Sequence, residues 1–91
     1  MKMKLGERRK VCISVRSMGK ESFEVTSAKY TLRIGGVIEA SGECSIEMRS
    51  GQETILSAVV QPQAKNAAYI LEYEYVIHPE ILKYEVGIQT E

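Results

Sequence analysis

The 91-residue sequence lacks several residue types, and each absence excludes a class of site. It contains no aspartate and no tryptophan, so all twelve acidic residues are glutamates. A calcium loop of the EF-hand type needs several short carboxylates close together in sequence, and this requirement excludes such a loop. The one histidine, His78, and the two cysteines, Cys12 and Cys44, are too few and too scattered for a four-ligand structural zinc site.

Motifs of catalysis and phosphate binding are absent as well. The sequence has no glycine-rich phosphate loop of either common type and no G-x-S-x-G nucleophile elbow. Glu72 and Glu74 stand two residues apart, but a glycosidase pair needs a cleft and a fixed carboxyl separation, so we interpret them as solubilising residues of a strand. His78 precedes a proline in an expected turn and is interpreted as a solvated side chain. The sequence therefore predicts a non-enzyme without metal or cofactor.

Net charge and long apolar runs are also missing. Twelve lysines and arginines balance the twelve glutamates, which argues against a chain that coats nucleic acid or an anionic membrane. No apolar run approaches the roughly 20 residues of a transmembrane helix, and the basic start of the sequence lacks the apolar stretch of a signal peptide. We therefore expect synthesis in the cytoplasm and no membrane partner. Reduced thiols are then the default, and a disulfide between Cys12 and Cys44 stays open.

The overall neutrality conceals two unlike halves. Residues 1–33 carry nine basic side chains and three glutamates, whereas residues 34–91 carry three basic side chains and nine glutamates. Such a split favours docking between oppositely charged patches. We interpret residues 1–9 as a basic tail ahead of a single domain at residues 10–91. A contact between this tail and nucleic acid is the alternative function, although nucleic acid is not the expected partner.

What the sequence does contain is a series of short alternating runs rich in β-branched residues. Valine, isoleucine and threonine together number 21. The alternation predicts strands over residues 10–16, 28–34, 37–40, 43–48, 54–61, 68–77 and from 82 to the end. The expected turns lie at residues 17–20, 35–36, 41–42, 49–52 and 78–80, and a loop is expected at 63–66 after Pro62 ends a strand. No helical stripe is present, so the sequence predicts an all-β, antiparallel sandwich of about seven strands.

The segment before the longest predicted strand carries a resemblance. Residues 62–71 read Pro-Gln-Ala-Lys-Asn-Ala-Ala-Tyr-Ile-Leu, with Ala67 two residues before Tyr69. This segment resembles the approach to strand F in immunoglobulin-like and fibronectin type III-like domains. The resemblance implies that Tyr69 is a structural tyrosine corner, whose hydroxyl bonds back to the loop backbone. Leu71 stands where antibody-type domains have a cysteine, so the resemblance is to the sandwich in general.

The layout of residues 30–91 is similar to that of small immunoglobulin-like proteins encoded in prophage structural gene clusters. Its order is strand, Gly-Gly turn, short strand, Ser-Gly, strand, proline loop, tyrosine-rich strand, turn and final strand. The similarity implies a structural or accessory role in a virion head or tail, with the protein associated with the particle after synthesis.

The expected function follows from the sandwich and its edges. Tyr69, Tyr73, Tyr75 and Tyr84 suggest either a binding surface or core residues, and we favour the core. Residues 11–16 and 82–89 are expected to lie at sheet edges, where strand addition or self-association supplies affinity through main-chain hydrogen bonds. The candidate interaction residues are Lys83, Tyr84 and Glu85. The sequence thus predicts a non-enzymatic protein-interaction or structural module.

Overall fold

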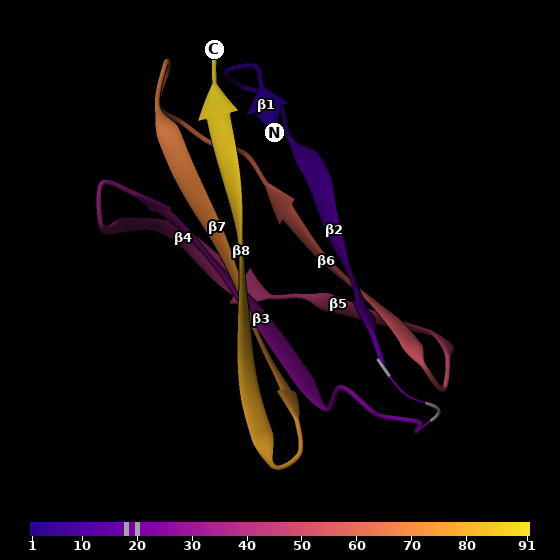
Figure 1. Cartoon of the computed structure of the whole chain (residues 1–91). Coiled ribbons are helices and arrows are strands. Elements are labelled where there is room, and N and C mark those ends of the chain that lie inside the picture. Colours follow the sequence, from indigo (N-terminus) through magenta and orange to yellow (C-terminus); the bar gives the residue numbers. More distant parts are fainter. Residues whose placement is uncertain (18, 20) are drawn as a thin grey trace.

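The chain folds into two packed sheets, antiparallel apart from one parallel pair of strands (Figure 1). The computed structural model describes residues 1–17, 19 and 21–91, so Met18 and Lys20 of the turn expected at 17–20 lie outside the described residues. Over the described residues the chain is all-β, as predicted, but it has eight strands and not about seven. The strands are β1 (Lys2–Met3), β2 (Arg9–Arg16), β3 (Ser27–Ile34), β4 (Val37–Glu43), β5 (Ser45–Ser50), β6 (Glu53–Val60), β7 (Ala68–Ile77) and β8 (Glu80–Thr90).

The larger sheet has the strand order β1-β8-β7-β3-β4, and the smaller sheet has the order β2-β6-β5. Neighbouring strands run antiparallel except for β1, which runs parallel to β8. The chain passes from the larger to the smaller sheet at Cys44, whose N–H donates a hydrogen bond to the carbonyl of Ala28 at 3.0 Å. In Figure 1, β2 and β6 form one side of the molecule, and the yellow β8 lies in front of the other sheet.

The core lies between the sheets and follows from the alternation of the strands. On β7, Tyr69, Leu71 and Tyr73 are at most 1% exposed, whereas Ile70 between them is 42% exposed. Successive side chains of a strand point to opposite faces, so one face of each strand is buried. Among the described residues, the core contains twelve buried apolar side chains: Met3, Val11, Val25, Ala28, Leu32, Leu56, Ala58, Val60, Tyr69, Leu71, Tyr73 and Ile88.

The first residues belong to the domain and are not a tail outside it. Lys2 pairs with Gln89 and Met3 with Thr90, and the Met3 side chain is 2% exposed within the core. The expectation of a basic tail over residues 1–9 is therefore corrected for β1. The physical reason is that the end of β8 offers unpaired backbone groups, and one apolar side chain among basic neighbours is enough to anchor a two-residue strand.

Two glycine positions show what the sequence signals correctly and what it does not. The expected Gly35-Gly36 turn joins β3 to β4 with positive φ angles of 56° and 80°, which suit glycine. The expected break at Gly42 is wrong, because β4 continues through it to Glu43. A Cβ at position 42 would lie 3.1 Å from a ring carbon of Tyr30, so this glycine makes room for a neighbouring side chain.

Tyr73 links the two sheets through a buried hydrogen bond. Its hydroxyl donates to the carbonyl of Val11 on β2 at 2.7 Å. Burial raises the pKa of Tyr73 well above its ordinary value, so the hydroxyl stays protonated and keeps its donor. A bond that joins β7 of one sheet to β2 of the other fixes their relative position.

The loop between β6 and β7 is held by side chains from three strands. The Tyr69 hydroxyl donates to Glu39 Oε1 at 2.6 Å and accepts a hydrogen bond from the Ala64 N–H at 2.8 Å. The Thr90 hydroxyl donates to the Ala64 carbonyl at 2.6 Å and accepts from the Ala67 N–H at 2.9 Å. Burial, followed by the bond to Glu39, raises the pKa of Tyr69. The loop backbone is therefore satisfied by β4, β7 and β8 together.

Thr54 and Thr90 form a natural pair for a stability measurement. Both are 1% exposed, but Thr54 Oγ1 has no hydrogen-bond partner among the described residues, whereas the Thr90 hydroxyl bonds to the loop. We expect Thr54→Val to raise the free energy of unfolding by about 1 kcal/mol, because a buried hydroxyl without a partner is costly. Thr90→Val is expected to lower it by about 1–3 kcal/mol. Urea unfolding measures both, and equal losses would contradict this reading of Thr54.

Candidate interaction site at the edge of β8

The outer edge of β8 is largely unpaired. β1 pairs with β8 at Gln89 and Thr90, and over residues 80–86 no described strand lies on that side. The direction of the backbone groups follows from the contacts of β1: the N–H of Gln89 donates to the Met1 carbonyl at 2.8 Å, and the N–H of Glu91 donates to the Met3 carbonyl at 3.0 Å. Alternate residues of a strand direct their N–H and C=O groups to the same side.

This alternation identifies which backbone groups are free. The ladder between β7 and β8 has no register shift, so the odd-numbered residues Ile81, Lys83 and Glu85 direct their N–H and C=O groups toward the open edge. The even-numbered residues, Tyr84 among them, direct theirs to β7. The open edge of β8 is thus a row of unpaired donors and acceptors, which we call the β8 edge (residues 80–86).

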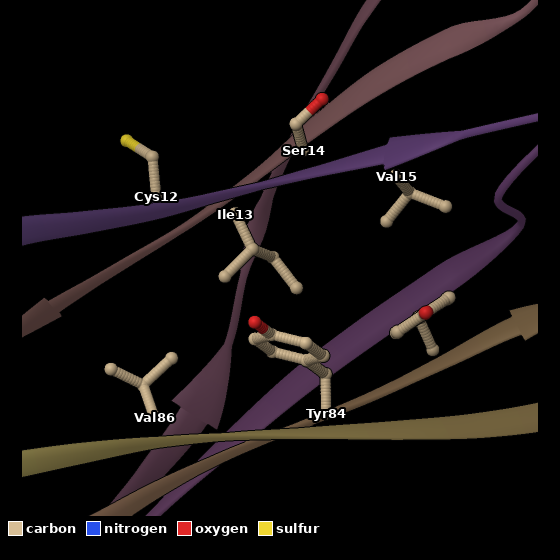
Figure 2. A pocket seen from close by; sticks show the side chains of 7 residues that line it. Cys12, Ile13, Ser14, Val15, Tyr84 and Val86 are labelled. Carbon is tan, nitrogen blue, oxygen red and sulfur yellow. The ribbon is translucent and has the colours of Figure 1, made fainter.

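A groove runs beside the β8 edge. It has a volume of about 380 Å³ and lies between β8 and β2, which is itself an edge strand of the smaller sheet. Figure 2 shows the Ile13 side chain directed toward Tyr84 and Val86, whereas Cys12 and Ser14 point away from them. The groove lining consists of Cys12, Ile13, Ser14, Val15, Tyr75, Tyr84 and Val86. The groove therefore combines apolar side chains with two strand edges.

Tyr84 lies in the groove and is unusually exposed for its position. It pairs in register with Tyr73, which is fully buried, yet Tyr84 itself is 54% exposed. Side chains paired across two strands share one face of the sheet, so Tyr84 points to the core side where the smaller sheet no longer covers it. The interpretation of the tyrosines as core residues thus fits Tyr69 and Tyr73, whereas Tyr75 is half-buried and Tyr84 is exposed.

Lys83 and Glu85 lie on the outer face of the same strand. Lys83 is opposite Glu74, and Glu85 is opposite Glu72 in the register of β7 and β8. Arg33 relieves the repulsion between the two facing glutamates, since its guanidinium lies 3.4 Å from the carboxylate of Glu72 and 3.9 Å from that of Glu85. Both Lys83 and Glu85 remain exposed, so their charges are accessible from the open edge.

The structure brings the three interaction residues named from the sequence together on one edge, with Lys83 and Glu85 on its outer face and Tyr84 in the groove. No protein-family model, curated protein or solved structure matches this chain. The groove residues of β2 lie within residues 11–16, which were expected at a sheet edge, but none of them was named as an interaction residue. Their only signal was the alternation of residues 10–16, which does not say where the opposite sheet ends.

The histidine and the two cysteines do not gather at the β8 edge, although Cys12 borders the groove with its side chain directed away from Tyr84 (Figure 2). His78 is exposed in the turn between β7 and β8. Cys12 is exposed with its Sγ 3.3 Å from Ser57 Oγ, and Cys44 is half-buried, where burial raises the pKa of its thiol to about 11. Both thiols are free, so the structure has no bond between them. Among residues 1–17, 19 and 21–91, no three histidine, cysteine or acidic side chains gather as a metal site would require.

The basic side chains near the start of the chain surround the turn that joins β1 to β2. Lys2, Lys4 and Arg9 line a shallow hollow there, together with Glu7 and Glu91. Arg9 is held by Glu7 at 3.7 Å and by the carbonyl of Lys2 at 3.4 Å.

The described part of the chain includes no helix long and apolar enough to cross a membrane.

Proposed function

We propose that this protein is a non-enzymatic, immunoglobulin-like interaction module that binds an extended segment of a protein partner along the β8 edge. The strand orders support the immunoglobulin-like assignment, because they match strands B, E and D in one sheet and strands G, F, C and C′ in the other. The bond from the Ala64 N–H to the Tyr69 hydroxyl at the start of β7 supports it as well. The setting that we propose is a phage-derived head or tail, on the resemblance of the strand layout.

The observation that carries the proposal is the unpaired backbone of Ile81, Lys83 and Glu85 beside the groove. An added strand forms main-chain hydrogen bonds with such an edge, and these bonds supply affinity largely independently of sequence. Alternate side chains of the bound segment would lie beside Tyr84 and Val86, where the side chains of the groove would select among them. An open edge beside Ile13, Val15 and Val86 is thus suited to extended segments that place an apolar residue at alternate positions.

Proline substitutions test the proposal, because the direction of each N–H on β8 is known. Glu85→Pro removes an N–H that points to the open edge, so we expect a folded protein that no longer binds an added strand. Tyr84→Pro is the control, since it removes an N–H directed at β7 and is expected to destabilise the fold by about 3 kcal/mol or more. Binding is measured with extended peptides selected on the full chain from a random display library.

The selected peptides are expected to alternate apolar and polar residues and to lose at least tenfold in affinity for Glu85→Pro, a difference of about 1.4 kcal/mol. Urea unfolding of Glu85→Pro must remain cooperative for the comparison to hold. A library that yields no binder, or binders that tolerate Glu85→Pro, would contradict strand addition at β8.

A further inference from the structure

The β8 edge is complementary to itself when two copies are placed antiparallel. Lys83 directly precedes Tyr84 and Glu85 directly follows it. The apolar residues Leu82 and Val86 lie two positions before and after Tyr84. Reversing the direction of the strand about Tyr84 therefore exchanges Lys83 with Glu85 and Leu82 with Val86. Over residues 82–86, each charged side chain would face one of opposite charge, and each apolar side chain would face another apolar one.

The backbone agrees with this register. Lys83 and Glu85 both direct their N–H and C=O groups to the open edge, as a hydrogen-bonded pair of an antiparallel ladder requires. Tyr84 directs its backbone to β7, so it would face Tyr84 of the second copy in a non-hydrogen-bonded pair, where side chains approach most closely. Both tyrosines would then lie on the groove side, where each is now 54% exposed.

We propose that the segment bound at the β8 edge is the β8 edge of a second copy, antiparallel and centred on Tyr84. This inference rests on the proposed function and names the partner. The contact is isologous: the same residues contribute from both copies, and Lys83 of each lies opposite Glu85 of the other. The larger sheets of the two copies would join into one continuous sheet.

Neighbouring registers are disfavoured by charge and by backbone direction. A shift that centres the pair on Lys83 places two lysines opposite each other, and a shift that centres it on Glu85 places two glutamates opposite each other. A shift by one residue brings outward-pointing backbone groups against residues whose groups point to β7. Toward the end of β8 the edge is occupied, because the terminal amine of Met1 donates to the Gly87 carbonyl at 3.3 Å and β1 pairs with Gln89 and Thr90, which limits how far a partner strand can slide in that direction.

Charge reversal on the full chain tests the register. Sedimentation equilibrium is expected to show a dimer for the native chain, and Lys83→Glu and Glu85→Lys are each expected to weaken dimerisation at least tenfold, since each places like charges opposite each other twice. An equimolar mixture of the two variants is expected to recover dimers, because each supplies the charge that the other lacks. The double variant K83E/E85K is expected to recover them alone. Both positions are exposed, and circular dichroism checks that each variant stays folded.

The outcomes separate this inference from the proposed function. A native chain that is monomeric up to about 1 mM overturns self-pairing, while binding of library peptides decides the proposed function independently. If both charge-reversal variants dimerise as the native chain does but Glu85→Pro does not, the register centred on Tyr84 is wrong. If Glu85→Pro dimerises as well, the dimer forms through another surface, and the inference is wrong.

Discussion

Met3→Ala is expected to lower the free energy of unfolding by about 2–4 kcal/mol. Met3 is 2% exposed and packs in the core although it belongs to a strand of two residues. Truncation removes the transfer free energy of the side chain and leaves a cavity beside β8, and a single domain of this size is stable by only about 5–15 kcal/mol. Urea unfolding monitored by circular dichroism gives the loss directly.

Met48→Ala is the matched control for this prediction. Met48 is 56% exposed on β5, so its truncation is expected to change the free energy of unfolding by about 0.5 kcal/mol or less. Met3→Leu nearly conserves volume and is expected to cost under about 1.5 kcal/mol, which keeps the test informative if Met3→Ala fails to fold. Equal effects of Met3→Ala and Met48→Ala would show that the start of the chain is not part of the core.

Tyr69→Phe is expected to destabilise the fold by about 2–3 kcal/mol. The substitution removes the hydroxyl that donates to the Glu39 carboxylate and accepts from the Ala64 N–H. Hydrogen bonds to charged groups contribute more than neutral ones, and the Ala64 N–H would lose its partner in the loop. Hydrogen exchange of the Ala64 amide is expected to accelerate in the variant even where the rest of the sheet remains protected.

Tyr30→Phe controls for the general effect of removing a tyrosine hydroxyl. Tyr30 is half-buried on β3, and its hydroxyl makes no hydrogen bond with the part of the chain that the structure describes. Its loss is therefore expected to change stability by about 0.5 kcal/mol or less. If Tyr69→Phe costs no more than Tyr30→Phe, the loop is held by the Thr90 contacts and not by the tyrosine.

The alternation of apolar and polar residues was sufficient to predict a strand where the strand is long and bounded by turn residues. The predicted strand over residues 68–77 has the same bounds as β7, because one face of it is continuously apolar, a polar loop precedes it and Pro79 follows it closely. The Gly35-Gly36 turn could also be predicted from the sequence, since few other residues accept two successive positive φ angles. These elements establish an all-β chain and much of its core from the sequence alone.

Features that depend on contacts between strands far apart in the chain could not be predicted from the sequence. β1 has two residues and so no period, and its partner β8 lies at the other end of the chain. Alternation places Tyr84 on the same face as Tyr73, but it does not reveal that the smaller sheet stops short of Tyr84. The sequence could thus name Lys83, Tyr84 and Glu85 as edge residues, whereas the groove beside them depends on how far each sheet extends.

The two-residue strand β1 also determines how much of β8 is open to the proposed strand pairing. It covers the end of β8 and leaves residues 80–86 open, so it limits a partner strand to a short stretch with few allowed alignments. Removing Met1 to Met3 would lengthen the exposed row of donors and acceptors to the whole of β8, and long apolar edges are templates for uncontrolled stacking of chains. On the proposed pairing, a segment with a single core side chain therefore keeps the open edge short enough for one alignment and guards the rest of β8 against aggregation.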